Sequence, residues 1–482
     1  MNTPITRLYL GVLVLFALLV AFTSNWAVFD ADELEANSAN KRPLLEQQQI
    51  ARGDIRSSDG ELIAISQQRG KGESKRFIRE YPQAALFGNP VGYDFIDEGR
   101  NGVELSKNDI LVGEENEFAT ILEQLSGEVE RGSDLTVTLD ASAQQVALDQ
   151  LGGRPGAVVA IEPSTGAVRV MASAPGYDPN EIPTKLSEFN QQEDAPLLNR
   201  STQSTYPPGS TFKVVTAAAA LDSGKFTPET TLDASSPQDF SGVPLANSGD
   251  AQYGVIPMTE ALTNSVNTYW AQVGEEIGSE TLIEYMRRFG FESDPDLDYP
   301  DTQMTASGIF EFDNKGESQL VDEGFDIARV AIGQGGEEGQ IRATPLQMAQ
   351  VAATVANDGV LMKPTFTQEV KDPDGRVSEE LDPEEQSEVM STESADQLAA
   401  MMTDVAEEGT ASSLSLGGTP FAGKTGTAEI DLEGLNQVWF IGFAPVDDPQ
   451  IAVAATVERC TGCFGGDTAG PIAMAVMQDL LG

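Results

Sequence analysis

The octapeptide Tyr206 to Lys213, "YPPGSTFK", places a serine three residues before a lysine, directly after two prolines and a glycine. Prolines end a preceding helix and suit the first turn of the next one, so Ser210 is predicted to open a helix. Lys213 then lies one turn further along the same face. The positive end of the helix dipole favours negative charge on a reacting oxygen. The stretch therefore predicts a hydroxyl and an amine side by side at an electropositive helix end.

The chain of 482 residues contains no histidine. This excludes Ser-His-Asp and Cys-His nucleophiles, and also histidine-based zinc and haem sites. Any proton transfer must therefore use Lys, Glu, Asp, Tyr or Cys. A partly desolvated lysine can lose its proton and act as a base, so Lys213 is a candidate base for Ser210.

The charge balance is strongly acidic, with 76 acidic and 29 basic residues and a formal net charge of −47. Such a surface repels phosphate backbones, so no nucleic-acid partner is expected. Two interpretations stay open, a surface adapted to concentrated salt and an ordinary self-repelling exported surface. Neither of them specifies a function.

The first 29 residues are predicted to form a short cytoplasmic tip and a single membrane anchor. Arg7 precedes an apolar run from Leu8 to Phe22, and Trp26 to Phe29 stand where interfacial aromatics are expected. Arg7 places the amino terminus inside and the rest of the chain outside the cell membrane. The alternative is a cleaved signal peptide, although no small-x-small cleavage site follows the run. Both interpretations export the bulk of the chain.

Two cysteines, Cys460 and Cys463, are separated by two residues. In an oxidising compartment they can close a tight disulfide, whereas a zinc site would need two more soft ligands. A redox CxxC normally opens a helix, but this pair follows a strand-like run, Ile451 to Val457. A structural role is expected, as a disulfide or as free thiols. No metal and no cofactor is predicted.

Two regions follow the anchor. Residues 30–132 are polar with short apolar runs, and "RGDIRSSDGELIA" (Arg52 to Ala64) predicts two strands around a turn at Asp59-Gly60. Residues 133–482 form the larger domain. Near its start, residues 156–173 predict two apolar strands joined by a turn.

The far end of the larger domain carries matching elements. Residues 437–458 predict two strands and residues 469–482 a closing helix with an apolar face. The two ends together predict an α+β fold, an antiparallel sheet flanked by helices. Residues 187–411 are predicted to be mostly helical, including a helix over Thr344 to Gly359 that Gly359 ends.

The Ser-x-x-Lys pattern alone is not specific, because "SANK" (Ser38 to Lys41) satisfies it too. Two further motifs follow Ser210 and Lys213 in order, Ser265-Val266-Asn267 and then Lys424-Thr425-Gly426-Thr427, the only Lys-Thr-Gly of the chain. Together they are the three elements of the penicillin-recognising serine acyl-transferases. Gly426 would let a substrate backbone approach the strand edge. The alternative is a set of unrelated helix caps and turns.

With these motifs the chain resembles the class B penicillin-binding proteins, and within them the actinobacterial penicillin-binding protein A group of peptidoglycan D,D-transpeptidases. The resemblance covers nearly the whole chain, through "RGDI", "GVEL" (Gly102 to Leu105), "LDASAQQVA", "GQGG" (Gly333 to Gly336) and "KTGTAE". It implies a penicillin-binding transpeptidase domain over 133–482 and a smaller β-rich, pedestal or dimerisation-like domain over 30–132. The CxxC pair and the extreme acidity depart from the pattern.

The resemblance also implies roles for the motif residues. Ser210 would attack the penultimate D-alanyl carbonyl, Lys213 would accept its proton and Ser265 would relay a proton to the leaving amine. Asn267 would hydrogen-bond the substrate amide. The terminal carboxylate would be held by Lys424, Thr425 and Thr427, and backbone amides of Ser210 and Thr427 would form an oxyanion hole.

The implied partners are stem peptides ending in D-Ala-D-Ala, β-lactams and a SEDS-family glycosyltransferase in the membrane. Three other activities compete with the transpeptidase. A class A β-lactamase is disfavoured because no Glu-x-x-Leu-Asn loop lies between Asn267 and Lys424. A D,D-carboxypeptidase would use water as the acceptor, although the "RGDI" region resembles transpeptidases. A non-catalytic wall scaffold or penicillin sensor would be acylated without turnover.

Overall fold

The structure, a computed structural model, describes residues 3–24, 49–71, 75–113, 131–313, 318–336, 339–430 and 434–482. Helix α1 (Thr3–Ser24) is fully exposed, with a mean hydropathy of 2.3, and contains the predicted apolar run Leu8 to Phe22. Within the described ranges it is the one helix long and apolar enough to cross a membrane. Trp26 to Phe29 and the "SANK" stretch lie outside these ranges.

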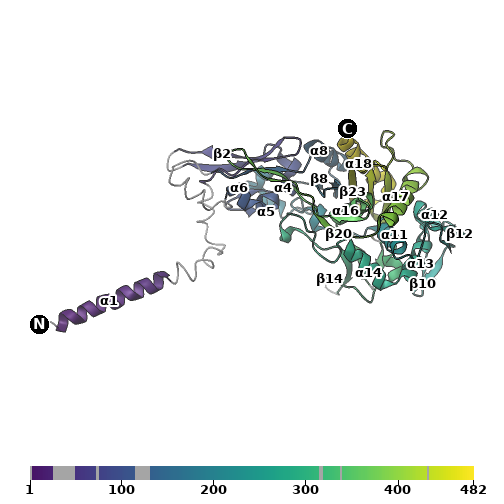
Figure 1. Cartoon of the computed structure of the whole chain (residues 1–482), viewed down its shortest axis with the longest axis horizontal. Coiled ribbons are helices and arrows are strands. Elements are labelled where there is room, and N and C mark those ends of the chain that lie inside the picture. Colours follow the sequence, from purple (N-terminus) through teal and green to yellow (C-terminus); the bar gives the residue numbers. More distant parts are fainter. Residues whose placement is uncertain are drawn as a thin grey trace.

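The predicted sheet from both ends of the larger domain is present. Five antiparallel strands run in the order β21-β22-β23-β7-β8, so the last strand of the chain, β23, pairs with β7, a strand near the start of the larger domain. In Figure 1, β8 and β23 belong to the same sheet, with β7 between them, although they are far apart in the sequence. The bounds are β7 (Gly156–Ile161), β8 (Val168–Ala174), β21 (Ala422–Glu429), β22 (Leu435–Ala444) and β23 (Ile451–Thr461).

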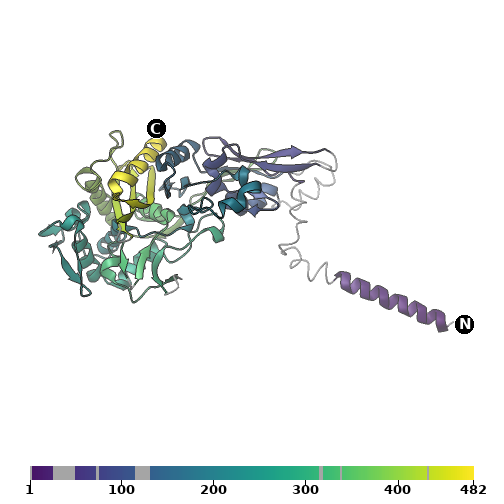
Figure 2. The same cartoon turned by 180° about the vertical axis from the view of Figure 1, so that it is seen from behind.

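Helices cover both faces of this sheet. Helices α8 (Ala141–Leu151) and α18 (Gly465–Leu481) pack together on one face, and α16 (Pro345–Ala356) lies against β7, β22 and β23 on the other. Figure 2 shows α18, in yellow, lying along the strands. The buried alanines and valines of β7 and β23 let the helices approach closely, because small apolar side chains fill the layers on both faces.

The prediction that residues 187–411 are mostly helical was wrong, because short strands and irregular segments together take up more of the described part of this range than helices do. The helices are α9 (Ile182–Phe189), α10 (Arg200–Gln203), α11 (Lys213–Asp222), α12 (Met258–Thr263), α13 (Asn267–Ile277), α14 (Ser279–Arg288), α15 (Ile327–Val330) and α17 (Thr392–Glu407). The interrupting strands are β9 (Thr231–Asp233), β10 (Gln238–Phe240), β11 (Val243–Leu245), β12 (Val255–Pro257), β13 (Gly308–Phe312), β14 (Ser318–Leu320), β15 (Gly335–Gly336), β16 (Gly339–Arg342), β17 (Val360–Met362) and β20 (Glu385–Glu388).

The end of α16 differs from the prediction. The helix stops at Ala356, and Gly359 lies in the following turn with φ 89° and donates from its N–H to Thr354 O over 2.9 Å. A Cβ on Gly359 would stand 2.2 Å from Met390 O. The glycine is therefore required because the turn after the helix needs a positive φ and passes close to Met390. It does not itself end the helix, contrary to the prediction from sequence.

A second, six-stranded sheet joins the N-terminal region to the larger domain. Its order is β19-β18-β6-β1-β2-β3. Strand β6 (Asp134–Val137) pairs in parallel with β1 (Ile55–Arg56) and antiparallel with β18 (Thr367–Lys371). The predicted turn at Asp59-Gly60 does join β1 to β2. The remaining strands are β2 (Leu62–Arg69), β3 (Arg76–Glu80) and β19 (Val377–Glu380).

This sheet crosses the predicted boundary at residue 132, so the division into 30–132 and 133–482 stays a prediction. The N-terminal region also contains the strand pair β4 (Asp94–Phe95) and β5 (Gly99–Arg100), and the short helices α4 (Gly88–Val91), α5 (Gly102–Ser106) and α6 (Asn108–Val112).

Buried charges explain the "RGDI" and "GVEL" segments. Glu104 is fully buried, and its carboxylate receives Arg52 Nη2 at 2.8 Å and Arg79 Nε at 2.5 Å. Burial alone would raise the pKa of Glu104, but the two guanidiniums outweigh it and hold the pKa below its ordinary value. Removing one member of such a buried cluster would leave the opposite charge buried without a partner, which is strongly destabilising. These residues therefore stabilise the packing of the N-terminal region.

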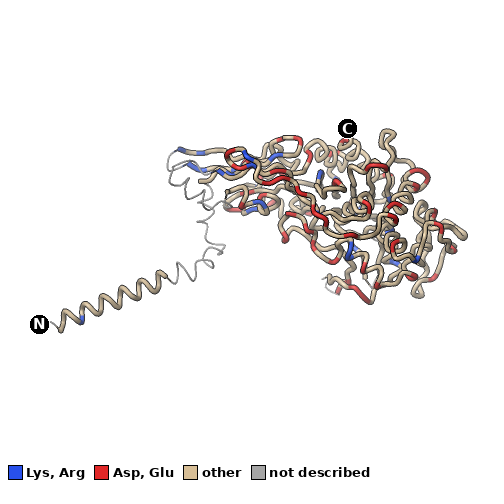
Figure 3. Tube along the Cα trace, viewed as in Figure 1, with Lys and Arg blue, Asp and Glu red and all other residues tan. Residues whose placement is uncertain are grey.

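Acidic residues are spread along the described chain after α1, as Figure 3 shows, while Arg69 and Arg76 lie on the hairpin of β2 and β3. The distribution is compatible with both interpretations of the acidity.

Candidate active site

Ser210 lies at the start of a helical segment, as predicted, but the first turn is a 3₁₀ helix. Gly209 to Phe212 form this turn, and the α-helix α11 begins at Lys213. Ser210 is half-buried, whereas Lys213 is fully buried. The turn is fixed from outside, because Gly209 N–H donates to Gly333 O over 2.9 Å. The "GQGG" segment therefore holds in place the loop Tyr206 to Ser210, called the serine loop below.

Lys213 Nζ connects two of the motifs. It lies 3.1 Å from Ser210 Oγ, 2.7 Å from Asn267 Oδ1 and 2.8 Å from the backbone oxygen of Ser265. The two carbonyl oxygens can only accept hydrogen bonds. A neutral amine has two hydrogens for these acceptors and keeps its lone pair for the hydroxyl of Ser210. The arrangement can therefore withdraw the proton of Ser210.

Ser265 lies between the two lysines. Its Oγ is 3.3 Å from Lys213 Nζ and receives a hydrogen bond from Lys424 Nζ over 3.0 Å. Its backbone has φ 57°, a left-handed conformation uncommon for serine, at the connection between α12 and α13. Asn267 Nδ2 donates to Ala246 O over 3.1 Å. The Ser-x-Asn motif thus presents both side chains to one point, as the sequence predicts.

Strand β21 supplies the third motif. Thr425 Oγ1 lies 2.7 Å from Thr410 Oγ1, and Thr427 Oγ1 accepts from Gly465 N–H over 3.2 Å. A Cβ on Gly426 would stand 2.7 Å from Pro208 O. The predicted reason for this glycine was access for substrate, but the contact with the chain's own serine loop already requires it.

Burial sets the protonation of the two lysines. It lowers the pKa of Lys424 from 10.5 to about 7. Burial and the nearby positive charge of Lys424 lower the pKa of Lys213 well below its ordinary value. A neutral Lys213 beside a charged Lys424 is therefore accessible near neutral pH, which is the combination that a base and an anion-binding group require.

Several contacts of the site were not predicted from sequence. Trp439 Nε1 donates to Pro207 O over 2.9 Å, and its ring packs edge-on against Tyr206 at a centroid distance of 6.1 Å. The partners Thr410 and Gly465 were also missed. Trp439 lies in the first of the two strands predicted within residues 437–458, and a large aromatic with a polar tip in the strand that follows the third motif was the one available signal.

The first prediction concerns Gly209. It has φ 54°, and a Cβ there would lie 2.9 Å from the carbonyl carbon of Thr427. We expect Gly209→Ala to lower the acylation rate at least about tenfold, because the serine loop must move away from β21. Gly224→Ala is the matched control, since Gly224 has φ 69° with open space around it.

Both alanine variants should lose about 1 kcal/mol of stability from the left-handed backbone. Thermal unfolding and penicillin acylation, measured side by side, check the prediction. Equal acylation rates in the two variants would contradict it.

The fold and the site together define a class. A serine with a buried lysine 3.1 Å away, a Ser-x-Asn beside it and a Lys-Thr-Gly strand along the edge of an antiparallel sheet are the parts of a penicillin-recognising serine acyl-transferase.

The comparisons with known proteins give the family. The pattern described as "Penicillin binding protein transpeptidase domain" matches residues 156–478, and "Penicillin binding protein A dimerisation domain" matches residues 52–135. The chain belongs to the class B penicillin-binding proteins.

Similar proteins include "Peptidoglycan D,D-transpeptidase PbpA" of Mycolicibacterium smegmatis, 33% identical over 100% of this chain and 99% of the relative. The protein of the same name from Mycobacterium tuberculosis is 31% identical over the same shares. A penicillin G acyl-enzyme structure of M. tuberculosis penicillin-binding protein A superimposes with a TM-score of 0.78 at 30% identity, covering 90% of this chain and 100% of that one.

Proposed function

We propose that Ser210 is the nucleophile of this chain, a peptidoglycan D,D-transpeptidase that acts through a serine acyl-enzyme. Relatives that match this chain over nearly their full length are named peptidoglycan D,D-transpeptidases. The structure of a similar protein is a penicillin G acyl-enzyme complex. The observation that supports Ser210 most directly is the 3.1 Å contact with Lys213 Nζ, whose other partners accept its hydrogens. The same site binds D-Ala-D-Ala stem peptides and β-lactams.

The proposed first step is acylation. Ser210 Oγ attacks the carbonyl carbon of the penultimate D-alanine while its proton passes to Lys213 Nζ. Ser265 Oγ, in contact with Lys213 and Lys424, relays a proton to the leaving amine. The carbon–nitrogen bond breaks, D-alanine leaves and an ester to Ser210 remains.

The second step reverses these roles. The amino group of a neighbouring stem peptide attacks the ester, gives up a proton to Lys213 and forms the cross-link. Ser210 regains its hydrogen. Asn267 is proposed to hold the substrate amide, since its Oδ1 is bound to Lys213 and its side chain lies beside Ser265 in the same motif.

Lys424, Thr425 and Thr427 are proposed to hold the terminal carboxylate. One ammonium and two hydroxyls can satisfy the carboxylate without losing a proton. The backbone amides of Ser210 and Thr427 would stabilise the oxyanion. A Cβ on Gly209 would lie 3.1 Å from Thr427 N, so these two backbone segments are adjacent.

We further propose that α1 is an uncleaved single-pass anchor with the catalytic domain outside the cell membrane. Its length and apolar composition support this. The N-terminal region, held rigid by the Arg52, Arg79 and Glu104 cluster, is proposed to dock a SEDS-family glycosyltransferase in the same membrane.

The second prediction tests the reaction. We expect the full chain in detergent, given a D-Ala-D-Ala stem-peptide mimic and an amine acceptor, to form more aminolysed than hydrolysed product, quantified by mass spectrometry. Omitting the acceptor is the control. Predominant hydrolysis at saturating amine would identify a carboxypeptidase, and acylation by penicillin without any turnover of peptide would identify a sensor or scaffold.

A further inference from the structure

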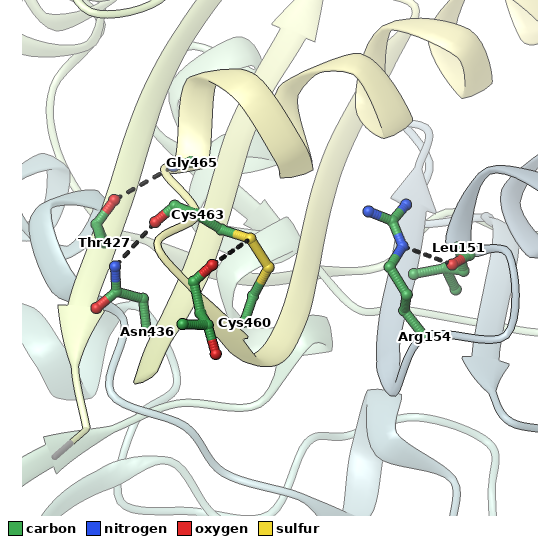
Figure 4. Close-up of a disulfide and its surroundings, with 8 residues drawn as sticks. Leu151, Arg154, Thr427, Asn436, Cys460, Cys463 and Gly465 are labelled. Carbon is green, nitrogen blue, oxygen red and sulfur yellow. Dashed lines mark hydrogen bonds between the residues drawn. A yellow bond between two sulfur atoms is a disulfide. The ribbon is translucent and has the colours of Figure 1, made fainter. Parts of the chain in front are cut away.

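The CxxC pair forms a disulfide beside the active site. Cys460 and Cys463 are joined in a disulfide, one of the two alternatives that the sequence left open, with their Cα atoms 5.5 Å apart. Cys460 lies near the end of β23, opposite Asn436 of β22, and Cys463 lies two residues before the start of α18. Figure 4 shows the bond next to Asn436, Gly465 and Thr427. The bond thus closes the turn that leads from the sheet into α18.

This turn lies directly on the Lys-Thr-Gly strand. Gly465 is buried, and a Cβ there would stand 2.5 Å from Gly426 O and 2.3 Å from Trp439 O. A Cβ on Gly466 would stand 3.6 Å from the methyl group of Thr425. The segment after Cys463 therefore contacts all three residues that follow Lys424.

One contact bears on the chemistry. Gly465 N–H donates to Thr427 Oγ1 over 3.2 Å. A hydroxyl whose oxygen already accepts from a fixed backbone N–H has fewer orientations for its own hydrogen. Thr427 can then direct that hydrogen to a substrate carboxylate without losing further freedom on binding.

Two tethers hold Cys463, and through it Gly465, in place. Asn436 Nδ2 donates to Cys463 O over 2.9 Å, and the disulfide ties the same residue to the end of β23. Thr461, Gly462 and Phe464 are exposed, although Thr461 pairs with Leu435 in the ladder of β22 and β23 and Gly462 N–H donates to Gly434 O over 3.3 Å. The disulfide adds a covalent restraint on Cys463 to these hydrogen bonds.

We propose that Cys460 and Cys463 are positioning residues for acylation: their disulfide fixes the turn that seats Gly465 on Thr427. The proposal rests on the carboxylate-binding role of Thr427 proposed above. A purely stabilising role is the rival explanation. The bond closes a loop between residues only three apart, and the entropic stabilisation by a disulfide is smallest for short loops.

The test is a double-mutant cycle on the full chain in detergent. Penicillin acylation is measured for the Cys460→Ser, Cys463→Ser double variant, for Thr427→Val and for the triple variant. We expect the serine pair to lower the acylation rate constant about tenfold, as a displaced binding group does. In the Thr427→Val background, where no hydroxyl accepts from Gly465, the same change should cost less than about twofold.

A second route leaves the sequence unchanged. Dithiothreitol converts the disulfide to two thiols with transfer of two electrons and two protons, and is itself oxidised to a cyclic disulfide. Reduced wild-type protein should acylate like the serine pair, and reoxidation should restore the rate. This second experiment tests the proposal even if the double serine variant does not fold.

Each outcome decides the proposal. A wild-type rate in the serine pair or after reduction would overturn it, and so would an equal loss with and without the Thr427 hydroxyl, which would indicate stabilisation alone. Wild-type labelling of a Ser210→Ala variant would instead overturn the proposed function, so the two failures are distinguishable.

Discussion

Ser210→Ala is expected to abolish covalent labelling of the full chain by fluorescent penicillin. The alanine removes the one oxygen that Lys213 Nζ contacts at 3.1 Å on the serine loop, and no neighbouring hydroxyl can replace it at that position. Ser265 Oγ is in contact with Lys213 too, but it is also held by Lys424. Labelling is read after denaturing electrophoresis, so that only a covalent ester is counted.

A matched control is available in the same chain. Ser38 belongs to the second Ser-x-x-Lys pattern, "SANK", which even contains a Ser-x-Asn of its own but lies far along the chain from the Lys-Thr-Gly motif. Ser38→Ala should be labelled like the wild type. Persistent labelling of Ser210→Ala, or its loss in Ser38→Ala, would remove Ser210 from the role of nucleophile.

Lys213→Ala is expected to lower the acylation rate by about 10²–10⁴-fold, the usual contribution of a positioned general base. The lysine is fully buried, and its Nζ is shared among Ser210, Ser265 and Asn267. Lys225→Ala is the control, because Lys225 is an exposed lysine just beyond the same helix. A rate within about threefold of the wild type would show that another group accepts the proton.

The same base predicts a pH dependence. Burial and Lys424 lower the pKa of Lys213, so the active neutral amine accumulates as pH rises through that lowered pKa, and kcat/KM rises with it. The pKa of Lys424 is about 7, so its charge is lost above that pH and the carboxylate is held less well. The wild-type profile of kcat/KM should be bell-shaped.

In Lys213→Ala the rising limb should be absent while the falling limb near pH 7 remains. Bound carboxylate favours the charged form of Lys424, so the falling limb of kcat should lie at higher pH than that of kcat/KM. A rising limb that survives in Lys213→Ala would assign it to a different group.

The sequence predicted contacts correctly where the residues lie close together in the chain. Ser210 and Lys213 lie one turn apart on a helical segment, and this spacing alone predicts their contact. The strands of the larger domain are continuous apolar runs that end at recognisable turns, so the antiparallel sheet could be predicted as well. The order of the three motifs then predicted which distant residues meet at Ser210, and the structure does bring Ser265, Asn267 and Lys424 there.

Sequence reasoning failed where backbone meets backbone over long separations. The pairing of β18 with β6 depends on tertiary packing, because a strand of five residues carries no signal for its partner. The contact of Gly465 with Thr427 involves a glycine N–H, which leaves no side-chain pattern to read. The end of α16 was misplaced because Asp358 adopts the left-handed conformation, with φ 54°. Aspartate tolerates this conformation, but its presence in a sequence does not predict it.

The shared six-stranded sheet bears on how fragments of this chain would behave. Strand β6 lies between β1 and β18, so a fragment that begins at residue 133 would lose β1 and present a bare row of N–H and C=O groups along β6. Such an open edge recruits strands from other molecules, and the fragment would be prone to aggregate during expression. The smallest well-behaved soluble piece should therefore begin before Arg52, so that β1 to β3 cover that edge.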